Sequence, residues 1–125
     1  MTEKSLVLIK PDAVERNLIG KILTIYEEND LKIVNMKLVL ASEEISEEHY
    51  LEHKGQPYFE KLIKCVTCSP LIALILEGDN AILRVRDLNK NVIRPKYAID
   101  GTLNSVHASD SEHNAKREIN IWFKN

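Results

Sequence analysis

The segment from Asn104 to Ser111 contains the residues whose types and spacing best fit a chemical role. His107 stands two residues before Ser109, which forms with Glu112 the spacing of a capping box that begins a helix. The free N–H groups of a helix N-terminus attract phosphate. Glu118 lies on the same expected helix, and its carboxylate can fix one imidazole nitrogen and leave the other as a nucleophile. The segment therefore predicts a histidine that reacts with a phosphate group.

Two other motifs match known chemistry less well. Gly20-Lys21 resembles the end of a phosphate-binding P-loop, but the earlier glycine and the following Ser or Thr of that motif are absent. Cys65 and Cys68 have the spacing of a redox pair, yet they stand at the C-terminus of an expected helix. Redox pairs gain their low thiol pKa at a helix N-terminus, so we interpret both cysteines as structural.

His49 and His53 are four residues apart and share one face of an expected helix, from which they can chelate a metal. No third ligand of matching type lies near them in the sequence. We therefore expect a solvated helix face here, and no metal site made by the protein.

Apolar runs and alternating patterns predict four strands, at residues 6–9, 34–40, 71–76 and 119–123. Helical spacing and capping residues predict helices at residues 19–26, 42–54, 59–68, 78–86 and 109–117. The second strand should bury one face, because its apolar residues alternate with polar ones, and the third should be central, because it has no polar face. Residues 84–104 are polar and irregular.

This order predicts an α+β fold, the βαββαβ ferredoxin-like sandwich. We expect a four-stranded antiparallel sheet with helices on one side and extra helices beyond the basic pattern. The chain of 125 residues carries no linker, repeat or low-complexity segment, so residues 1–125 should form a single domain.

Composition narrows the class of protein. The formal net charge of −2, from 17 basic and 19 acidic side chains, argues against a nucleic-acid-binding protein. Two cysteines are too few for a disulfide scaffold and favour a reducing compartment. The N-terminus lacks the apolar region of a signal peptide, and no stretch reaches the roughly 20 apolar residues of a membrane-spanning helix. We expect a cytoplasmic protein without membrane or nucleic-acid partners.

Several short motifs follow one another along nearly the whole chain. They are Ile9-Lys10-Pro11-Asp12-Ala13-Val14 with Gly20, His49-Tyr50, Pro57-Tyr58-Phe59-x-x-Leu62, Gly78-x-Asn80-Ala81 with Arg86, Ile93-Arg94, Asn104-x-x-His107-x-Ser109-Asp110, and Ala115-x-x-Glu118-Ile119-x-x-Trp122-Phe123. In this order they resemble the nucleoside diphosphate kinase family. The resemblance implies a ferredoxin-like fold and a ping-pong reaction that maintains nucleoside triphosphate pools. In it, ATP or another triphosphate gives its γ-phosphoryl group to a histidine, and a diphosphate then collects the group.

The same resemblance implies four catalytic residues. His107 resembles the phosphorylated nucleophile, which suits imidazole because its reference pKa of about 6.5 leaves much of it neutral at pH 7. Glu118 resembles the residue that orients this ring, with Ser109 in support. Lys10 resembles the lysine that reaches the ribose 3′-hydroxyl and the phosphates.

The remaining implied roles concern nucleotide binding. Arg86 and Arg94 resemble the pair that grips the phosphates, and Asn104 the asparagine that binds the ribose. Tyr58 resembles the aromatic residue on which the base stacks, with Leu62 beside it. Every base offers a π-face, so stacking implies broad nucleotide specificity. Mg²⁺ is expected on the nucleotide phosphates and on water, without protein ligands.

The sequence departs from the family pattern between its two phosphate-binding arginines. Only residues 87–93 separate Arg86 from Arg94, where family members usually have a longer loop with a Thr-Asn-Pro element. The phosphate-binding threonine therefore has no clear counterpart. That loop contributes to subunit contacts in hexamers, so its shortening leaves the number of subunits open. We expect a homo-oligomer that is a hexamer, a tetramer or a dimer.

Two other functions remain as alternatives. The shortened loop raises the first, a non-catalytic nucleotide-binding or regulatory relative that has lost turnover. The second is a small ferredoxin-like nucleic-acid binder, against which the net charge and the lack of a basic or aromatic stripe both argue.

Overall fold

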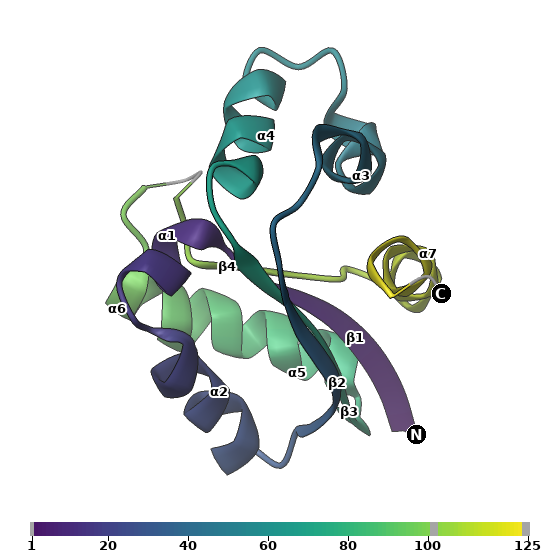
Figure 1. Ribbon diagram of the computed structural model, residues 1–125. Coiled ribbons are helices and arrows are strands. Elements are labelled where there is room, and N and C mark those ends of the chain that lie inside the picture. Colours follow the sequence, from purple (N-terminus) through teal and green to yellow (C-terminus); the bar gives the residue numbers. More distant parts are fainter. Residues whose placement is uncertain (1, 101–102, 124–125) are drawn as a thin grey trace.

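The computed structural model describes residues 2–100 and 103–123. Its centre is a four-stranded antiparallel sheet in the order β2-β3-β1-β4. The strands are β1 (Thr2–Ile9), β2 (Lys32–Val39), β3 (Leu71–Asp79) and β4 (Val106–Ala108). Figure 1 shows them with the helices that surround them. The predicted α+β, ferredoxin-like sheet is confirmed.

Helical segments connect the strands and account for most of the remaining chain. They are α1 (Pro11–Glu15), α2 (Ile19–Glu28), α3 (Glu43–His49), the 3₁₀ turn η1 (Leu51–His53), α4 (Phe59–Thr67), α5 (Ala81–Leu88), the π-helical turn η2 (Asn89–Ile93), α6 (Arg94–Tyr97) and α7 (Glu112–Trp122). None of the helices built from described residues is long and apolar enough to span a membrane.

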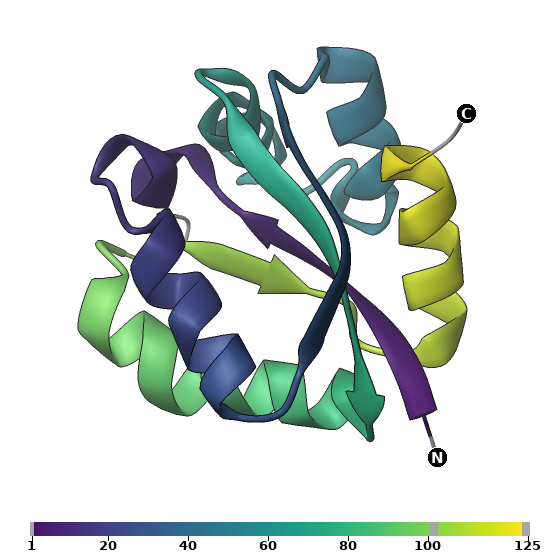
Figure 2. The same ribbon diagram turned by 60° about the horizontal axis from the view of Figure 1, so that its bottom comes forward.

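Both faces of the sheet are covered, which corrects the prediction that helices lie on one side only. Alternate residues of β1 point to opposite faces, as a strand requires. Val7 and Ile9 pack into a core with Ile22 and Val85, from α2 and α5. Leu6 and Leu8 pack into a second core under α3, α4 and α7. Figures 1 and 2 show the two helical layers on either side of the sheet.

The central strands β1 and β3 follow the prediction. All six residues from Leu71 to Leu76 are buried, because helices cover both sides of β3 and strands flank it. β3 pairs with β1 from Ile72 opposite Ile9 to Asp79 opposite Thr2. The outer strands pair with these two central strands, β2 with β3 and β4 with β1.

The outer strand β2 contradicts its predicted burial. Met36, Leu38 and Leu40 are 44%, 62% and 63% exposed, and Val34 at the irregular step in the register is 39% exposed. Alternation of apolar and polar residues therefore indicated a strand correctly, but Met36, Leu38 and Leu40 stay largely exposed although α2 contacts the strand. The reason is positional, because β2 stands at the edge of the sheet.

The last predicted strand, at residues 119–123, is helical. These residues belong mostly to α7, whose buried side chains are Ala115, Glu118 and Trp122. Their spacing of three and four residues is the helical period, which the short apolar run at the end of the chain hid. The fourth strand is instead Val106–Ala108, which lies between the expected irregular segment at residues 84–104 and the expected helix at residues 109–117.

The region between Arg86 and Arg94 is also helical, although residues 84–104 were expected to be irregular. α5 continues through η2 into α6, so that Arg86 and Arg94 project from one nearly continuous helical segment. Inside η2 the buried Asn89 accepts a hydrogen bond of 2.6 Å from the Tyr26 hydroxyl of α2. This buried polar contact fixes η2 against α2.

Candidate active site

The short strand β4 places His107 on the sheet. It pairs with β1 so that His107 stands opposite Leu8. Val106 and Ala108 are buried in the core under α2 and α5, so the side chain between them points to the other face, toward α3 and α7. The His107 side chain is 23% exposed, which leaves it open to a ligand.

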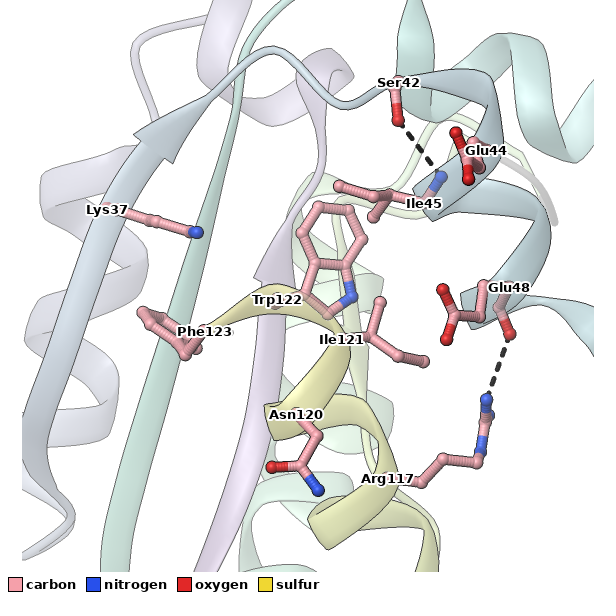
Figure 3. A pocket seen from close by; sticks show the side chains of 10 residues that line it. All are labelled: Lys37, Ser42, Glu44, Ile45, Glu48, Arg117, Asn120, Ile121, Trp122 and Phe123. Carbon is pink, nitrogen blue, oxygen red and sulfur yellow. Dashed lines mark hydrogen bonds between the residues drawn. The ribbon is translucent and has the colours of Figure 1, made fainter. Parts of the chain in front are cut away.

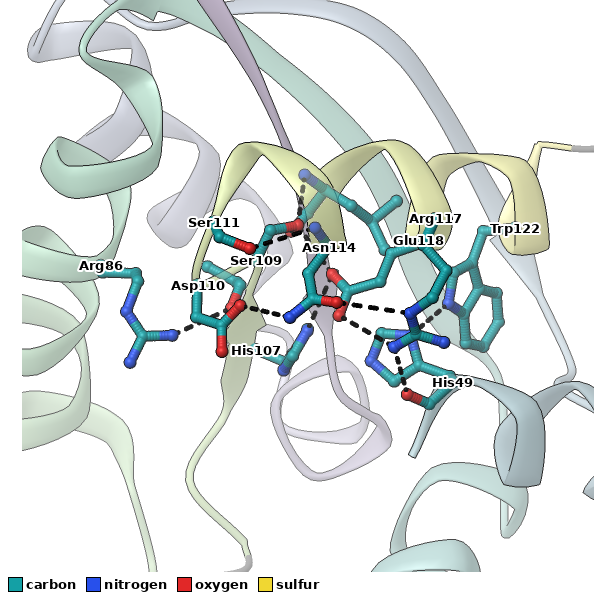
Figure 4. Close-up of polar contacts among 12 residues, drawn as sticks. His49, Arg86, His107, Ser109, Asp110, Ser111, Asn114, Arg117, Glu118 and Trp122 are labelled. Atoms are coloured by element: carbon teal, nitrogen blue, oxygen red, sulfur yellow. Dashed lines mark hydrogen bonds and ion pairs between the residues drawn. The ribbon is translucent and has the colours of Figure 1, made fainter. Parts of the chain in front are cut away.

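Ser109, Glu118 and His107 form a chain of polar contacts (Figure 4). Ser109 is fully buried and donates from Oγ to Oε1 of Glu118 at 2.7 Å, while the same Oγ accepts from the N–H of Leu6 at 3.1 Å. Glu118 Oε1 lies 3.4 Å from Nε2 of His107. Glu118 is thus held by Ser109 in front of one nitrogen of the imidazole.

The predicted cap at Ser109 is wrong. The residue that caps α7 is Ser111, whose Oγ accepts from the N–H of Asn114 at 3.1 Å. Ser109 fits the capping box in the sequence because Glu112 follows it by three residues, but the path of the chain after β4 makes Ser111 the cap. Ser109 is consequently free to bind Glu118.

The second nitrogen of His107, Nδ1, makes no hydrogen bond within residues 2–100 and 103–123. The other ring nitrogen, Nε2, faces the carboxylate of Glu118, which favours a proton on Nε2 and a lone pair on Nδ1. A neutral imidazole in this tautomer is a nucleophile on its Nδ1 side. The predicted arrangement of one fixed and one open nitrogen is therefore present.

Arg86 and Arg94 reach the outer edge of β4. Arg94 donates from Nη2 to the carbonyl oxygen of Val106 at 3.0 Å, and Arg86 approaches the carbonyl of Ala108 from Nη1 at 3.4 Å. Burial lowers the pKa of Arg94, and the charge of Arg86 lowers it further. Two guanidinium groups beside one strand repel each other, so an anion bound between them would be favourable.

Lys10 and Asn104 meet at the end of β1 next to His107. Lys10 is 2% exposed, and its Nζ donates to Oδ1 of Asn104 at 3.2 Å. Burial lowers the pKa of Lys10, while the carboxylate of Asp12 raises it. A buried ammonium of this kind is a strong binding site for a negatively charged group.

The turn that leads into β4 is held by residues that the sequence analysis did not single out. Ser105 is buried and has a φ of 76°, and its N–H donates to Oδ2 of Asp12 at 3.0 Å. Arg16 contacts the same carboxylate at 3.5 Å and donates to the carbonyl of Tyr97. These contacts join α1, α6 and β4, and they place Asn104 and His107 relative to Lys10.

Tyr58 and Leu62 stand on the hairpin of α3 and α4. Tyr58 is 45% exposed at the start of α4, and its hydroxyl lies 2.7 Å from Nδ1 of His53. Leu62 is half-buried against the core under α3, α4 and α7. The His53 ring is 6.0 Å from that of Tyr50, which in turn is 5.9 Å from the ring of His107. The hairpin therefore stands beside the imidazole, with an aromatic face open to solvent.

The expectation of a solvated face at His49 is wrong. His49 is 3% exposed, and its ring centroid lies 4.5 Å from that of His107. Its neighbour Tyr50 is also buried, which raises the pKa of its hydroxyl. Helix α3 packs against α7, so the face that looked polar in the sequence is turned inward. Only their membership in the His49-Tyr50 motif pointed to these two residues.

A cavity of about 950 Å³ opens away from this cluster, between β2, α3 and α7 (Figure 3). Its lining includes Lys37, Ile45, Arg117 and Phe123, and it shares Trp122 with the surroundings of His49. Its charged lining residues are of both signs, Lys37 and Arg117 with Glu44 and Glu48, whereas Lys10, Arg86 and Arg94 bring only positive charge to β4. The chemistry of the molecule is thus concentrated around β4.

Comparison with known proteins shows the family of this chain. The family model described as nucleoside diphosphate kinase matches residues 3–125. A nucleoside diphosphate kinase of Clostridium perfringens is 54% identical over 130 residues, which covers 97% of this chain and 91% of that protein.

Two solved structures are similar over the whole fold. The nucleoside diphosphate kinase of Aquifex aeolicus has a TM-score of 0.91 and 31% identity, with coverage of 100% of this chain and 97% of its own. That of Halobacterium salinarum, solved in complex with CDP, has a TM-score of 0.93 and 36% identity, with coverage of 100% and 90%. This chain belongs to the nucleoside diphosphate kinase family and is a phosphotransferase that acts between nucleoside triphosphates and nucleoside diphosphates.

Proposed function

We propose that the reaction proceeds in two half-reactions through a phosphorylated His107. In the first, the Nδ1 lone pair attacks the γ-phosphorus of a triphosphate, and the bond from that phosphorus to the β–γ bridging oxygen breaks. The diphosphate leaves with the electron pair. In the second, a β-phosphate oxygen of another diphosphate attacks the phosphorus, and the N–P bond breaks. The contact of 3.4 Å between Nε2 and Glu118, with Nδ1 open, is the observation that carries this proposal.

Glu118 and Ser109 orient the imidazole in this scheme. The carboxylate balances the positive charge that the ring gains when Nδ1 bonds to phosphorus. Ser109 keeps the carboxylate in place through its contact of 2.7 Å. Both residues act on His107 and leave the nucleotide to other side chains.

Arg86, Arg94 and Lys10 hold the phosphates. Phosphoryl transfer passes through a loose transition state, so fixed positive charge around the moving group is the main catalytic device. The two arginines stand at the outer edge of β4 and Lys10 at its other side. Asn104, which contacts Lys10 Nζ at 3.2 Å, binds the ribose beside it.

Tyr58 and Leu62 bind the base. Tyr58 offers an exposed ring at the tip of the α3–α4 hairpin, and Leu62 extends the apolar surface next to it. Stacking on such a surface requires no hydrogen bond to a base edge, so all common bases are accepted. The reaction therefore takes (d)NTPs and NDPs in general.

Mg²⁺ enters as part of the metal–nucleotide substrate. Nucleoside diphosphate kinases use a divalent metal ion for catalysis. Within the described part of the chain, the one group of three side chains suited to a metal is His49, His107 and Glu118. Two nitrogen ligands do not suit Mg²⁺, which prefers oxygen. The ion is therefore carried by phosphate oxygens and water.

We further propose that residues 1–125 form one catalytic domain of a cytoplasmic homo-oligomer. Support for the oligomer comes from the edge strand β2, where Met36 and Leu38, followed by Leu40 just after the strand, form an exposed apolar row near the exposed Val34. An exposed apolar row of this kind is unfavourable in water and favours contact with another subunit.

A two-step labelling experiment tests the mechanism. The protein is incubated with [γ-³²P]ATP and separated from nucleotide, and unlabelled GDP is then added. We expect acid-labile, base-stable label on the protein after the first step and labelled GTP after the second. Label that never appears on the protein would favour direct transfer or a non-catalytic relative, and label that GDP fails to remove would contradict the second half-reaction.

A further inference from the structure

His49 is a buried imidazole to which the proposed mechanism gives no role. It is the last residue of α3 and is 3% exposed. Its ring meets the ring of His107 edge to face, with centroids 4.5 Å apart and planes at 78°. The ring of Tyr50 is farther from His107, at 5.9 Å. His49 is thus in direct contact with the nucleophile.

Trp122 fixes the tautomer of His49. Its indole Nε1–H donates to Nδ1 of His49 at 2.9 Å. Indole nitrogen can only donate, so Nδ1 must accept and carries no proton. Burial, together with the nearby positive charges of Arg117 and Lys10, lowers the pKa of His49 well below its ordinary value. The ring is therefore neutral, with its proton on Nε2.

Helix α7 binds His49 and also carries Glu118, which faces His107. Arg117 of α7 donates to the carbonyl oxygens of Glu48 and His49 at 3.0 and 3.1 Å. Trp122, on the same helix, holds the imidazole ring of His49. Glu118 stands between these two in the sequence and faces His107 (Figure 4). The relative positions of His49, Glu118 and His107 are thus set by α7.

The Nε2–H of His49 has no hydrogen-bond partner within residues 2–100 and 103–123. A buried donor without a partner is unfavourable, and it persists where function requires it. One nitrogen of His49, one nitrogen of His107 and a carboxylate oxygen of Glu118 all lie within 4.8 Å of one another. A donor in this position favours negative charge at the centre of the cluster.

A metal ion is a poorer explanation of the cluster. To bind a metal through Nε2, His49 would have to move its proton to Nδ1, which faces the indole N–H of Trp122. Two donors would then oppose each other. The tautomer therefore favours a hydrogen-bond donor at His49 over a metal ligand.

We propose that His49 is a positioning residue for phosphoryl transfer, a neutral imidazole of fixed tautomer that holds the ring of His107 beside Glu118. The inference rests on the proposed phosphorylation of His107. His49 acts through His107 and does not bind the nucleotide. Its loss should therefore lower the rate of phosphorylation of the bound complex and leave nucleotide affinity unchanged.

Two substitutions of His49 separate this role from simple packing. His49→Phe keeps a ring of similar size and removes the Nε2–H, whereas His49→Gln keeps an N–H close to the position of Nε2. Rapid-quench measurement of phosphorylation by [γ-³²P]ATP should show the maximal rate of the Phe variant reduced about tenfold, because this variant lacks the donor that lies beside His107 and Glu118. The ATP concentration for half-maximal rate should be unchanged, and the Gln variant should keep most of the rate. A Phe variant as fast as the unaltered protein, or a Gln variant as slow as the Phe variant, would overturn the proposal.

The tautomer gives a second test that does not depend on catalysis or on a folded His49→Phe variant. A long-range ¹H–¹⁵N spectrum of the unaltered protein should show the His49 signals of an unprotonated Nδ1 and a protonated Nε2, and Trp122→Phe should mix the two tautomers. The opposite tautomer would contradict the proposal, as would stoichiometric Zn²⁺ binding by calorimetry that His49→Gln abolishes. If His107→Ala kept the label, the proposed function would fail while the tautomer result stood.

Discussion

Of the two outer strands of the sheet, the longer one, β2, is mostly exposed, and the shorter one, β4, is mostly buried. β2 has eight residues and alternates apolar with polar side chains, yet most of it is exposed. β4 has three residues in a polar segment, yet Val106 is 0% and Ala108 3% exposed. β4 is covered by α5 and η2 on one face, and Arg86 and Arg94 reach its outer carbonyl oxygens.

This contrast shows that an edge strand is defined by what packs on it as much as by its own pattern. β4 holds His107 rigidly because its neighbours Val106 and Ala108 are anchored in the core. β2 leaves its apolar row free, which supports a contact outside the chain. Each of the following substitutions changes one side of this comparison.

The largest expected effect is the loss of His107 from β4. His107→Ala should lower the rate of a coupled kinase assay by at least about 10⁴-fold, because removal of the nucleophile leaves only binding effects. Labelling by [γ-³²P]ATP should vanish with it. His113→Ala, an exposed histidine of α7, is the matched control and should stay within about twofold. Equal activity of both variants would remove His107 from the mechanism.

Removal of an arginine from the outer edge of β4 should have the next largest effect. Arg94→Ala takes away a half-buried positive charge beside the proposed phosphate site, and we expect kcat to fall about 10²- to 10³-fold. Lys96→Ala removes an exposed charge from the same helix and serves as control. If steady-state kinetics showed the same loss for both variants, a general charge effect would replace a specific contact.

The same substitution on both outer strands should cost different amounts of stability. Val106→Ala removes fully buried methyl groups, so the free energy of unfolding should fall by about 2 kcal/mol. Val34→Ala, at a residue that is 39% exposed, should change it by less than about 0.5 kcal/mol in dilute solution. Urea unfolding measures both. Equal losses would mean that a second subunit still covers β2 at the protein concentration used.

The smallest effect on the free chain is expected at Leu38 of β2, which should instead alter assembly. Leu38→Lys places a charge in the exposed row, so the mass measured by light scattering should fall toward that of a single chain. Leu83→Lys is the control, since Leu83 is 72% exposed on α5, outside the row. An unchanged mass for Leu38→Lys would place the subunit contact elsewhere.

The sequence by itself determined the central strands, most helices and the fold class. The run from Leu71 to Leu76 and the spacing in residues 59–68 are local signals, and local patterns are sufficient for such elements. It also pointed to the residues that gather around His107, because their motifs match those of a family shown by the comparisons. Their individual roles remain predictions.

Only the tertiary structure decided which faces are covered and which polar groups meet. The burial of His49 depends on the packing of α3 against α7, the choice of Ser111 over Ser109 as cap depends on the path after β4, and the exposure of β2 depends on its place in the sheet. Each of these outcomes depends on how segments far apart in the chain are placed in space. A periodic pattern shows which side of an element differs from the other, and only the neighbours in space determine which side is buried.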